Sequence, residues 1–214
     1  MTFEQLIEEG RRLQRPCFFL RPQANGPVAA IWHGRDAAGI ESAGHHCRIT
    51  VDARCIPGLP GSVTGYVSVF TDEEKCKGGK VEVSPSWPKR PGTALYAYPA
   101  AVLAPIDAVF ARGSEAVGEW VRSCGWERTE RYNDNFKEAA VVREYERVWM
   151  REFPVFLESD IHAVLGGWHF PMADDDWHDL LDEQLMVLTI ADSEPWVEAW
   201  HTQAGQFRVI QRIS

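Results

Sequence analysis

Short runs rich in Val, Ile, Phe and Thr recur along the chain, and turn-forming residues separate them. In the first half these runs are CFFLR (17–21), PVAAIWHG (27–34), CRITVDA (47–53), SVTGYVSVF (62–70) and KVEVS (80–84). In the last third they are QLMVLTI (184–190), PWVEAW (195–200) and QFRVIQRI (206–213). Such residues favour strands, and the glycine-containing turns before residue 80 and at 201–205 predict two hairpins. Mostly antiparallel strands are therefore expected.

Three other stretches have the residue spacing of amphipathic helices. The first carries Phe3, Leu6, Ile7 and Leu13 and ends before Pro16, and the second, residues 105–124, reads as one helix or as two with a restart at Ser114. The third, residues 140–153, places Val141, Tyr145, Val148, Trp149 and Phe153 on one stripe, although strict alternation also fits part of it. Three to four helices interspersed among hairpins predict an α+β fold.

The length of 214 residues suits a single domain, 1–214, with a candidate subdomain boundary at the Pro- and Gly-rich residues 84–93. No apolar run reaches the roughly 18 residues that span a bilayer. The N-terminus, MTFEQLIEEGRRLQRP, lacks the apolar segment of a signal peptide. We therefore expect a cytoplasmic protein without membrane contact. Its five cysteines form no C-x-x-C pair, which predicts free thiols rather than a disulfide framework.

The net charge of −9 is concentrated in the last 63 residues. Residues 1–151 contain 20 Lys/Arg and 19 Asp/Glu, whereas residues 152–207 contain 12 Asp/Glu and neither Lys nor Arg. An acidic C-terminal part of this kind repels phosphate and speaks against nucleic-acid binding. It favours a cationic protein partner, because complementary charge steers association. The alternative is a solvated acidic face that only increases solubility.

The candidate binding residues combine this charge with aromatic side chains. Carboxylates pair with arginine in two-bond geometry, and tryptophan supplies a large contact area at protein interfaces. We expect the binding surface to comprise Trp168, Asp174, Asp175, Asp176, Trp177, Asp179 and Glu194. Tryptophans buried in the core are the competing interpretation, above all for Trp196 and Trp200.

Motifs for catalysis and for cofactors are missing from the sequence. It contains no G-x-S-x-G elbow, no P-loop and no G-x-G-x-x-G after a strand, so we expect no catalytic residue and no cofactor. The alternative is a metal-assisted hydrolase that uses His162, His169 and His178 with Asp174–Asp176, since imidazole and carboxylate are suitable ligands for zinc or manganese. The spacing of these histidines matches no standard metal motif, and neither does the group His45, His46, Cys47 and Cys55.

One C-terminal succession resembles a known family. Ile161-His162-Ala163-Val164-Leu165-Gly166-Gly167-Trp168 with Pro171 precedes the apolar run 185–190, Asp192-Ser193, Trp200, Gly205 and a strand around 207–210. This pattern, over about a quarter of the chain, is similar to the C-terminal part of the YwqG-like bacterial family of unknown function. The resemblance implies an α+β bacterial domain of a kind found near secreted-toxin loci, where small proteins often act as immunity factors. It supplies no catalytic residue.

Charge and resemblance lead to the same expectation. We expect a non-enzymatic cytoplasmic binding protein, of the immunity type, that inhibits a basic toxin domain or another cationic protein through its acidic, tryptophan-containing C-terminal surface. The metal-assisted hydrolase is the alternative. The oligomeric state is left open by the sequence.

Overall fold

The computed structural model describes residues 1–34, 41–42, 45–72, 78–125, 140–154, 158–168, 182–190 and 196–212. The chain divides into two compact units, each built from separate segments. The helical unit comprises Met1–Arg15, Ala101–Pro154 and Phe170–Leu181. The strand unit comprises Pro16–Ala100, Val155–His169 and Asp182–Ser214.

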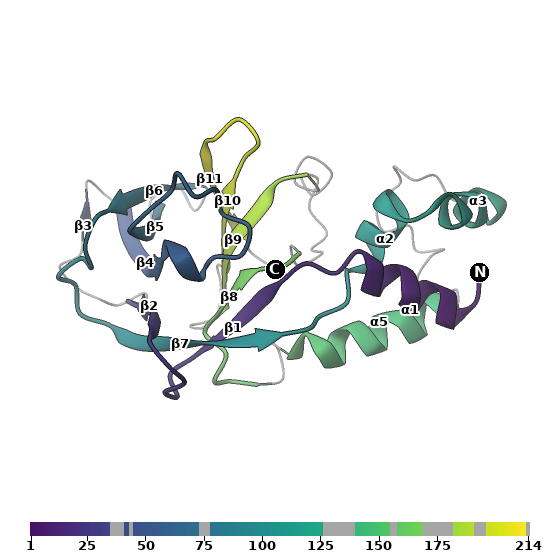
Figure 1. Ribbon diagram of the computed structural model, residues 1–214, viewed down its shortest axis with the longest axis horizontal. Coiled ribbons are helices and arrows are strands. Elements are labelled where there is room, and N and C mark those ends of the chain that lie inside the picture. Colours follow the sequence, from purple (N-terminus) through teal and green to yellow (C-terminus); the bar gives the residue numbers. More distant parts are fainter. Residues whose placement is uncertain are drawn as a thin grey trace. The chain divides into compact units, whose positions relative to one another are not determined.

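The helical unit contains, among its described residues, four α-helices (Figure 1). They are α1 (Phe3–Arg12), α2 (Ile106–Arg112), α3 (Glu115–Ser123) and α5 (Ala140–Glu152). The start of α1 follows from a capping box: the Gln5 amide N–H donates to Thr2 Oγ1 at 3.3 Å, and the Thr2 amide donates to Gln5 Oε1 at 2.8 Å. Pro16 and Pro154 follow the ends of α1 and α5, as expected for a residue that disfavours helix just before it.

The contact between α1 and α5 depends on a glycine and a tyrosine. The buried hydroxyl of Tyr145 donates to the Ala104 carbonyl at 2.6 Å. A Cβ atom at Gly10 would lie only 2.0 Å from the Tyr145 Oη atom, so only glycine fits there without a shift. Beside this contact, Arg11 forms an ion pair with Glu152, whose Oε2 atom also accepts the Leu103 amide N–H at 3.0 Å.

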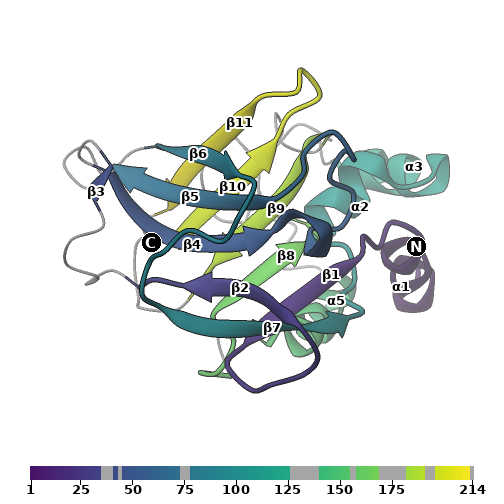
Figure 2. The same cartoon turned by 60° about the vertical axis from the view of Figure 1, so that its left-hand side comes forward.

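The strand unit is a single eleven-stranded sheet in which all pairings are antiparallel. Its strands are β1 (Cys17–Arg21), β2 (Val28–Trp32), β3 (Glu41–Ser42), β4 (His45–Asp52), β5 (Tyr66–Asp72), β6 (Gly79–Ser84), β7 (Thr93–Ala100), β8 (Ala163–Gly166), β9 (Gln184–Thr189), β10 (Trp196–His201) and β11 (Phe207–Arg212). Ten of them follow the order β11-β10-β9-β8-β1-β7-β2-β4-β5-β6, and β3 pairs with β4 outside this path (Figure 2). A 3-10 turn, η1 (Ala53–Cys55), follows β4.

The sheet curls into a nearly closed barrel in which β6 and β11 are the two edge strands. A side chain of β11 reaches across this gap: Gln211 Nε2 donates to the carbonyl of Asp72, the last residue of β5, at 3.1 Å and to the carbonyl of Gly78, just before β6, at 2.7 Å. A Cβ atom at Gly79 would lie 2.9 Å from Val209 Cγ1, so the two edges approach closely at this point. The path from β11 to β6 contains ten strands, an even number, so the two edge strands run in opposite directions and can approach as antiparallel neighbours.

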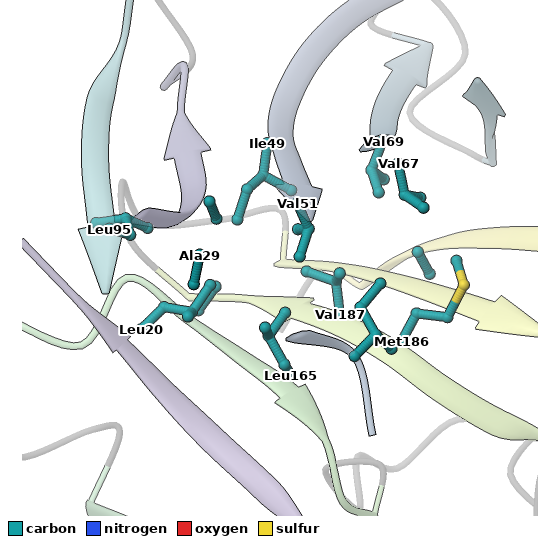
Figure 3. Close-up of a cluster of buried hydrophobic side chains, with 14 of the residues drawn as sticks. Leu20, Ala29, Ile49, Val51, Val67, Val69, Leu95, Leu165, Met186 and Val187 are labelled. Carbon is teal, nitrogen blue, oxygen red and sulfur yellow. The ribbon is translucent and has the colours of Figure 1, made fainter. Parts of the chain in front are cut away.

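The interior of the barrel is apolar. Side chains from strands far apart in the sequence converge there in Figure 3, including Leu20 of β1, Val51 of β4, Leu95 of β7 and Leu165 of β8, all fully buried. β9 is buried along almost its whole length. Because successive residues of a strand point to opposite faces of the sheet, both faces of β9 are covered. Each fully buried leucine or valine contributes about 1.5–3 kcal/mol to folding.

The predicted α+β class is confirmed, with strands dominant, but three details of the prediction need correction. No strand was predicted for β3, β7 or β8, and the barrel was not anticipated. On α5 the buried residues include Val142, whereas the predicted Val141 and Val148 remain partly exposed. In the described part of the chain, no helix is both long enough and apolar enough to cross a membrane.

Candidate functional site

The predicted binding surface lies mostly outside the described residues. Six of its seven members do so: Asp174, Asp175, Asp176, Trp177, Asp179 and Glu194. The same holds for His169 and His178 of the alternative metal site. Trp168 is described and is partly exposed.

Two left-handed glycines position Trp168. Gly166, at the end of β8, has a φ of 67°, and Gly167 has a φ of 79°, a region that other residues rarely adopt. The Gly167 amide donates to the Pro16 carbonyl at 3.0 Å, which anchors this turn to the start of β1. These features define the backbone just before Trp168, which precedes the acidic residues 174–183 in the sequence.

The acidic residues form two groups in the sequence, 174–183 before β9 and 192–194 after it. β8 and β9 are adjacent antiparallel strands joined by residues 167–183, and residues 190–195 join β9 to its other neighbour, β10. Six residues of strand separate these connections, a distance of about 20 Å. Along the chain, Trp168 and the acidic residues 174–183 therefore precede β9, and Glu194 follows it.

Within the described part of residues 152–207, at least five of the carboxylates make contacts inside the protein. Arg11 pairs with Glu152, and Arg21 pairs with both Glu158 and Asp160. These ion pairs also raise the pKa of Arg21, although burial opposes them as the largest single influence. Glu198 is completely buried and accepts the Trp200 indole N–H at 3.2 Å. Glu183, at the end of the acidic residues 174–183, accepts the Gln203 amide N–H at 2.6 Å, so contacts within the protein also reach this segment.

His162, the described histidine of the alternative metal site, makes contacts typical of a structural residue. Its Nδ1 atom lies 3.1 Å from the Asp160 carbonyl, and its ring meets Trp32 edge-on at 6.0 Å. The described residues contain no group of three side chains placed to bind a metal ion. The hydrolase alternative therefore gains no support from the described part and stays a prediction.

A buried polar cluster on the outer face of the barrel was not predicted. His33 follows β2, Thr50 lies on β4, Ser68 on β5, and Arg90 on the loop between β6 and β7; His33, Thr50 and Ser68 are almost completely buried. His33 Nε2 lies 3.0 Å from Thr50 Oγ1, which lies 2.9 Å from Ser68 Oγ. Arg90 Nη1 donates to Ser68 Oγ at 3.4 Å. His33 Nδ1 lies 2.7 Å from the Pro91 carbonyl.

Strand register brings these residues together. Thr50 and Ser68 are direct partners on β4 and β5, on the face opposite the core residues Val51 and Val67. A bulge at Arg48 shifts the register of β4 by one residue, so that Cys47 lies on the same face as Thr50 although they are three residues apart. No local pattern reveals this cluster, because Thr50 and Ser68 each alternate with apolar neighbours as ordinary outward-facing residues would.

The hydrogen bonds of this cluster run in one direction. The Pro91 carbonyl can only accept, so His33 Nδ1 carries a hydrogen, and burial lowers the pKa of His33, which keeps the ring neutral. His33 Nε2 then accepts from Thr50, Thr50 accepts from Ser68, and Ser68 accepts from Arg90. A fully satisfied buried network fixes the position of the groups that form it.

The thiol beside this network is not set up as a nucleophile. Cys47 is completely buried and lies 3.8 Å from Arg90 Nη1. Burial raises the pKa of Cys47 more strongly than the neighbouring Arg90 lowers it, so the thiolate that attack requires is disfavoured. The cluster therefore acts as a structural tie. As predicted, Cys17 and Cys47 are buried free thiols, whereas Cys124 is exposed.

Comparisons with known proteins add no relative. A scan against protein-family models, a search of curated proteins and a search of solved structures each found no match. The resemblance of the C-terminal quarter to the YwqG-like family stays a prediction.

Proposed function

We propose that this chain is a non-enzymatic binding protein of the immunity type, which docks a basic toxin domain or another cationic protein. The docking surface consists of Trp168 and the acidic residues that follow it, Asp174–Asp176, Trp177 and Asp179. Glu194 is the remaining member of the predicted surface and belongs to the second acidic segment, residues 192–194.

One observation carries the proposal: 12 carboxylates and no Lys or Arg lie in residues 152–207. Ordinary protein surfaces mix both signs, and an uncompensated cluster of acids costs self-repulsion that a cationic partner would relieve. Eight of these 12 carboxylates lie in two short segments, residues 174–183 and 192–194, so the negative charge is concentrated along the sequence. Trp168, which follows the glycine turn, supplies an aromatic anchor just before the larger segment in the sequence.

We expect the three aspartates to form solvent-exposed ion pairs with the partner, and this sets the expected strength of the contact. An exposed ion pair contributes roughly 0.2–1 kcal/mol to binding. Neutralising three aspartates is therefore expected to raise the dissociation constant roughly 3- to 150-fold. Because screening by salt acts on such pairs, binding is expected to weaken strongly as the ionic strength rises.

The test is affinity capture from the native host at low ionic strength, followed by titration of the captured protein after its purification. Wild-type chain is expected to retain one basic protein and to release it with salt. The triple variant Asp174→Asn, Asp175→Asn, Asp176→Asn is expected to lose it.

A matched control separates a specific surface from total charge. The triple variant Glu8→Gln, Glu119→Gln, Glu144→Gln removes three exposed acids from the helices of the helical unit and changes the net charge from −9 to −6, as the aspartate variant does. It is expected to bind as wild type does. Equal weakening by both variants, or the failure of wild type to retain any basic protein, would overturn the proposal.

A further inference from the structure

The loop that joins β6 to β7, residues 85–92, crosses the outer face of the barrel and is called here the crossover. In the sheet these two strands are separated by β5, β4 and β2, so the loop must pass over all three (Figure 2). Its backbone lies against β2, since a Cβ atom at Gly92 would be 2.4 Å from the Trp32 carbonyl oxygen. Trp87 packs on Tyr66 with ring centroids 4.1 Å apart.

The polar cluster connects two consecutive residues of the crossover through the sheet beneath it. The series of donors starts at Arg90, passes through Ser68, Thr50 and His33, and ends on the Pro91 carbonyl. Arg90 also lies over the Phe70 ring, 4.9 Å from its centroid. The direction of the hydrogens from Arg90 through Ser68 and Thr50 requires a neutral Nε2 atom on His33, whereas Nδ1–H can donate to the Pro91 carbonyl in either protonation state.

The surroundings of His33 disfavour a positive charge on its ring. Within the described residues, the charged and titratable groups around it are Arg90 on the crossover, His46, Cys47 and Arg48 on β4, and Lys80 and Glu82 on β6. Glu82 is the carboxylate among them, and it pairs with Lys80 at 2.7 Å and with Arg90 at 4.0 Å. None of these groups is placed to accept a proton from Nε2 in the way that Thr50 donates to it.

We propose that His33 is a proton-operated latch for the crossover: the neutral ring holds residues 85–92 against the sheet, and the protonated ring releases them. A proton on Nε2 would point at Thr50 Oγ1, whose own hydrogen lies along that line. Thr50 would have to turn its hydroxyl toward Ser68, whose hydrogen would then lose its acceptor. The ring would also become a second cation next to Arg90.

The release has a defined consequence. Cys47 and Phe70, both completely buried beneath Arg90, form a small apolar cluster that the crossover covers. In the open state His33 regains its ordinary pKa near 6.5, so opening binds a proton and becomes more favourable as the pH falls below about 6.5. The population of the open state rises by at most roughly tenfold for each unit by which the pH falls. This rise ends below the pKa that His33 has in the docked state.

The test measures the access of a thiol reagent to Cys47 as a function of pH. A dipyridyl disulfide that stays reactive in acid is applied briefly, and each cysteine is quantified by peptide mass spectrometry relative to the unfolded chain at the same pH. Cys17 is an internal control, because it is buried in the same unit on β1, away from the crossover. Between about pH 7.5 and about pH 5, labelling of Cys47 is expected to rise at least roughly fivefold while that of Cys17 stays constant.

Variants at the latch sharpen the result. His33→Gln removes the titratable ring, so labelling of Cys47 is expected to become independent of pH. Thr50→Ser keeps the hydroxyl group and is expected to retain the pH profile of the wild type. The wild-type profile decides the matter even if a variant fails to fold. A flat Cys47 profile, or a parallel rise at Cys17 that indicates global unfolding, would overturn the latch. The proposal is independent of the proposed binding function.

Discussion

Asp107 offers a direct test of how the helical unit tolerates a buried carboxylate. It lies in the first turn of α2, and its Oδ1 atom is buried without a hydrogen-bond partner among the described residues. Burial, together with the nearby charge of Glu146, raises the pKa of Asp107 from 3.8 to about 6. The folded protein therefore holds this proton more tightly than the unfolded chain does.

The size of the effect follows from that shift. A difference of about two pKa units corresponds to about 3 kcal/mol, which destabilises the fold at neutral pH and disappears below the unfolded pKa near 3.8. The negative charge of Asp107 at the N-terminus of α2 offsets about 0.3–1 kcal/mol of this destabilisation, because it interacts favourably with the helix dipole. Asp107→Asn is therefore expected to raise the free energy of unfolding by about 1–3 kcal/mol at pH near 7, and the gain should shrink toward zero as the pH falls through about 6 to about 4.

Urea unfolding followed by far-ultraviolet circular dichroism, repeated across this pH range, measures the difference. The matched control is Glu115→Gln, which removes an exposed carboxylate from the first turn of α3. It is expected to lower stability slightly, by less than about 1 kcal/mol, since only the helix dipole is affected. If Asp107→Asn destabilises the protein at neutral pH, or if its effect does not change with pH, then the carboxylate is compensated and the reasoning fails.

Three further substitutions test the packing. Gly10→Ala is expected to cost about 1–3 kcal/mol through its clash with the Tyr145 hydroxyl, and Tyr145→Phe in the same chain should recover part of that loss in thermal unfolding, since the two sites are coupled. Gly166→Ala should cost about 1–3 kcal/mol in urea unfolding, because its φ is 67° and the new Cβ would lie 2.7 Å from the Pro16 carbonyl oxygen. Gln211→Ala should increase hydrogen exchange along β6 and β11 without unfolding β9, and unchanged exchange would show that the edges do not need this tie.

Local patterns identified most of the secondary structure. The capping box before α1, the continuous apolar run of β9 and the glycine turn between β10 and β11 each act within a few residues, so the sequence predicts them. β7 was missed because Pro99 interrupts a stretch that otherwise alternates, and β8 because it has only four residues. The buried face of α5 was misjudged by one residue at Val142, since its neighbours in the fold decide which side faces inward.

The sequence by itself determined which segments are helix or strand and where the negative charge is concentrated, because both depend on neighbouring residues and on composition. Only the tertiary structure decided which of those charges are engaged, as Arg21 with Glu158 shows, and which polar residues meet beneath the crossover. His33 and the Pro91 carbonyl are 58 positions apart, and their contact requires a particular strand order and a loop that passes over three strands. Such contacts arise from the closure of the whole sheet, which no periodicity of a single segment records.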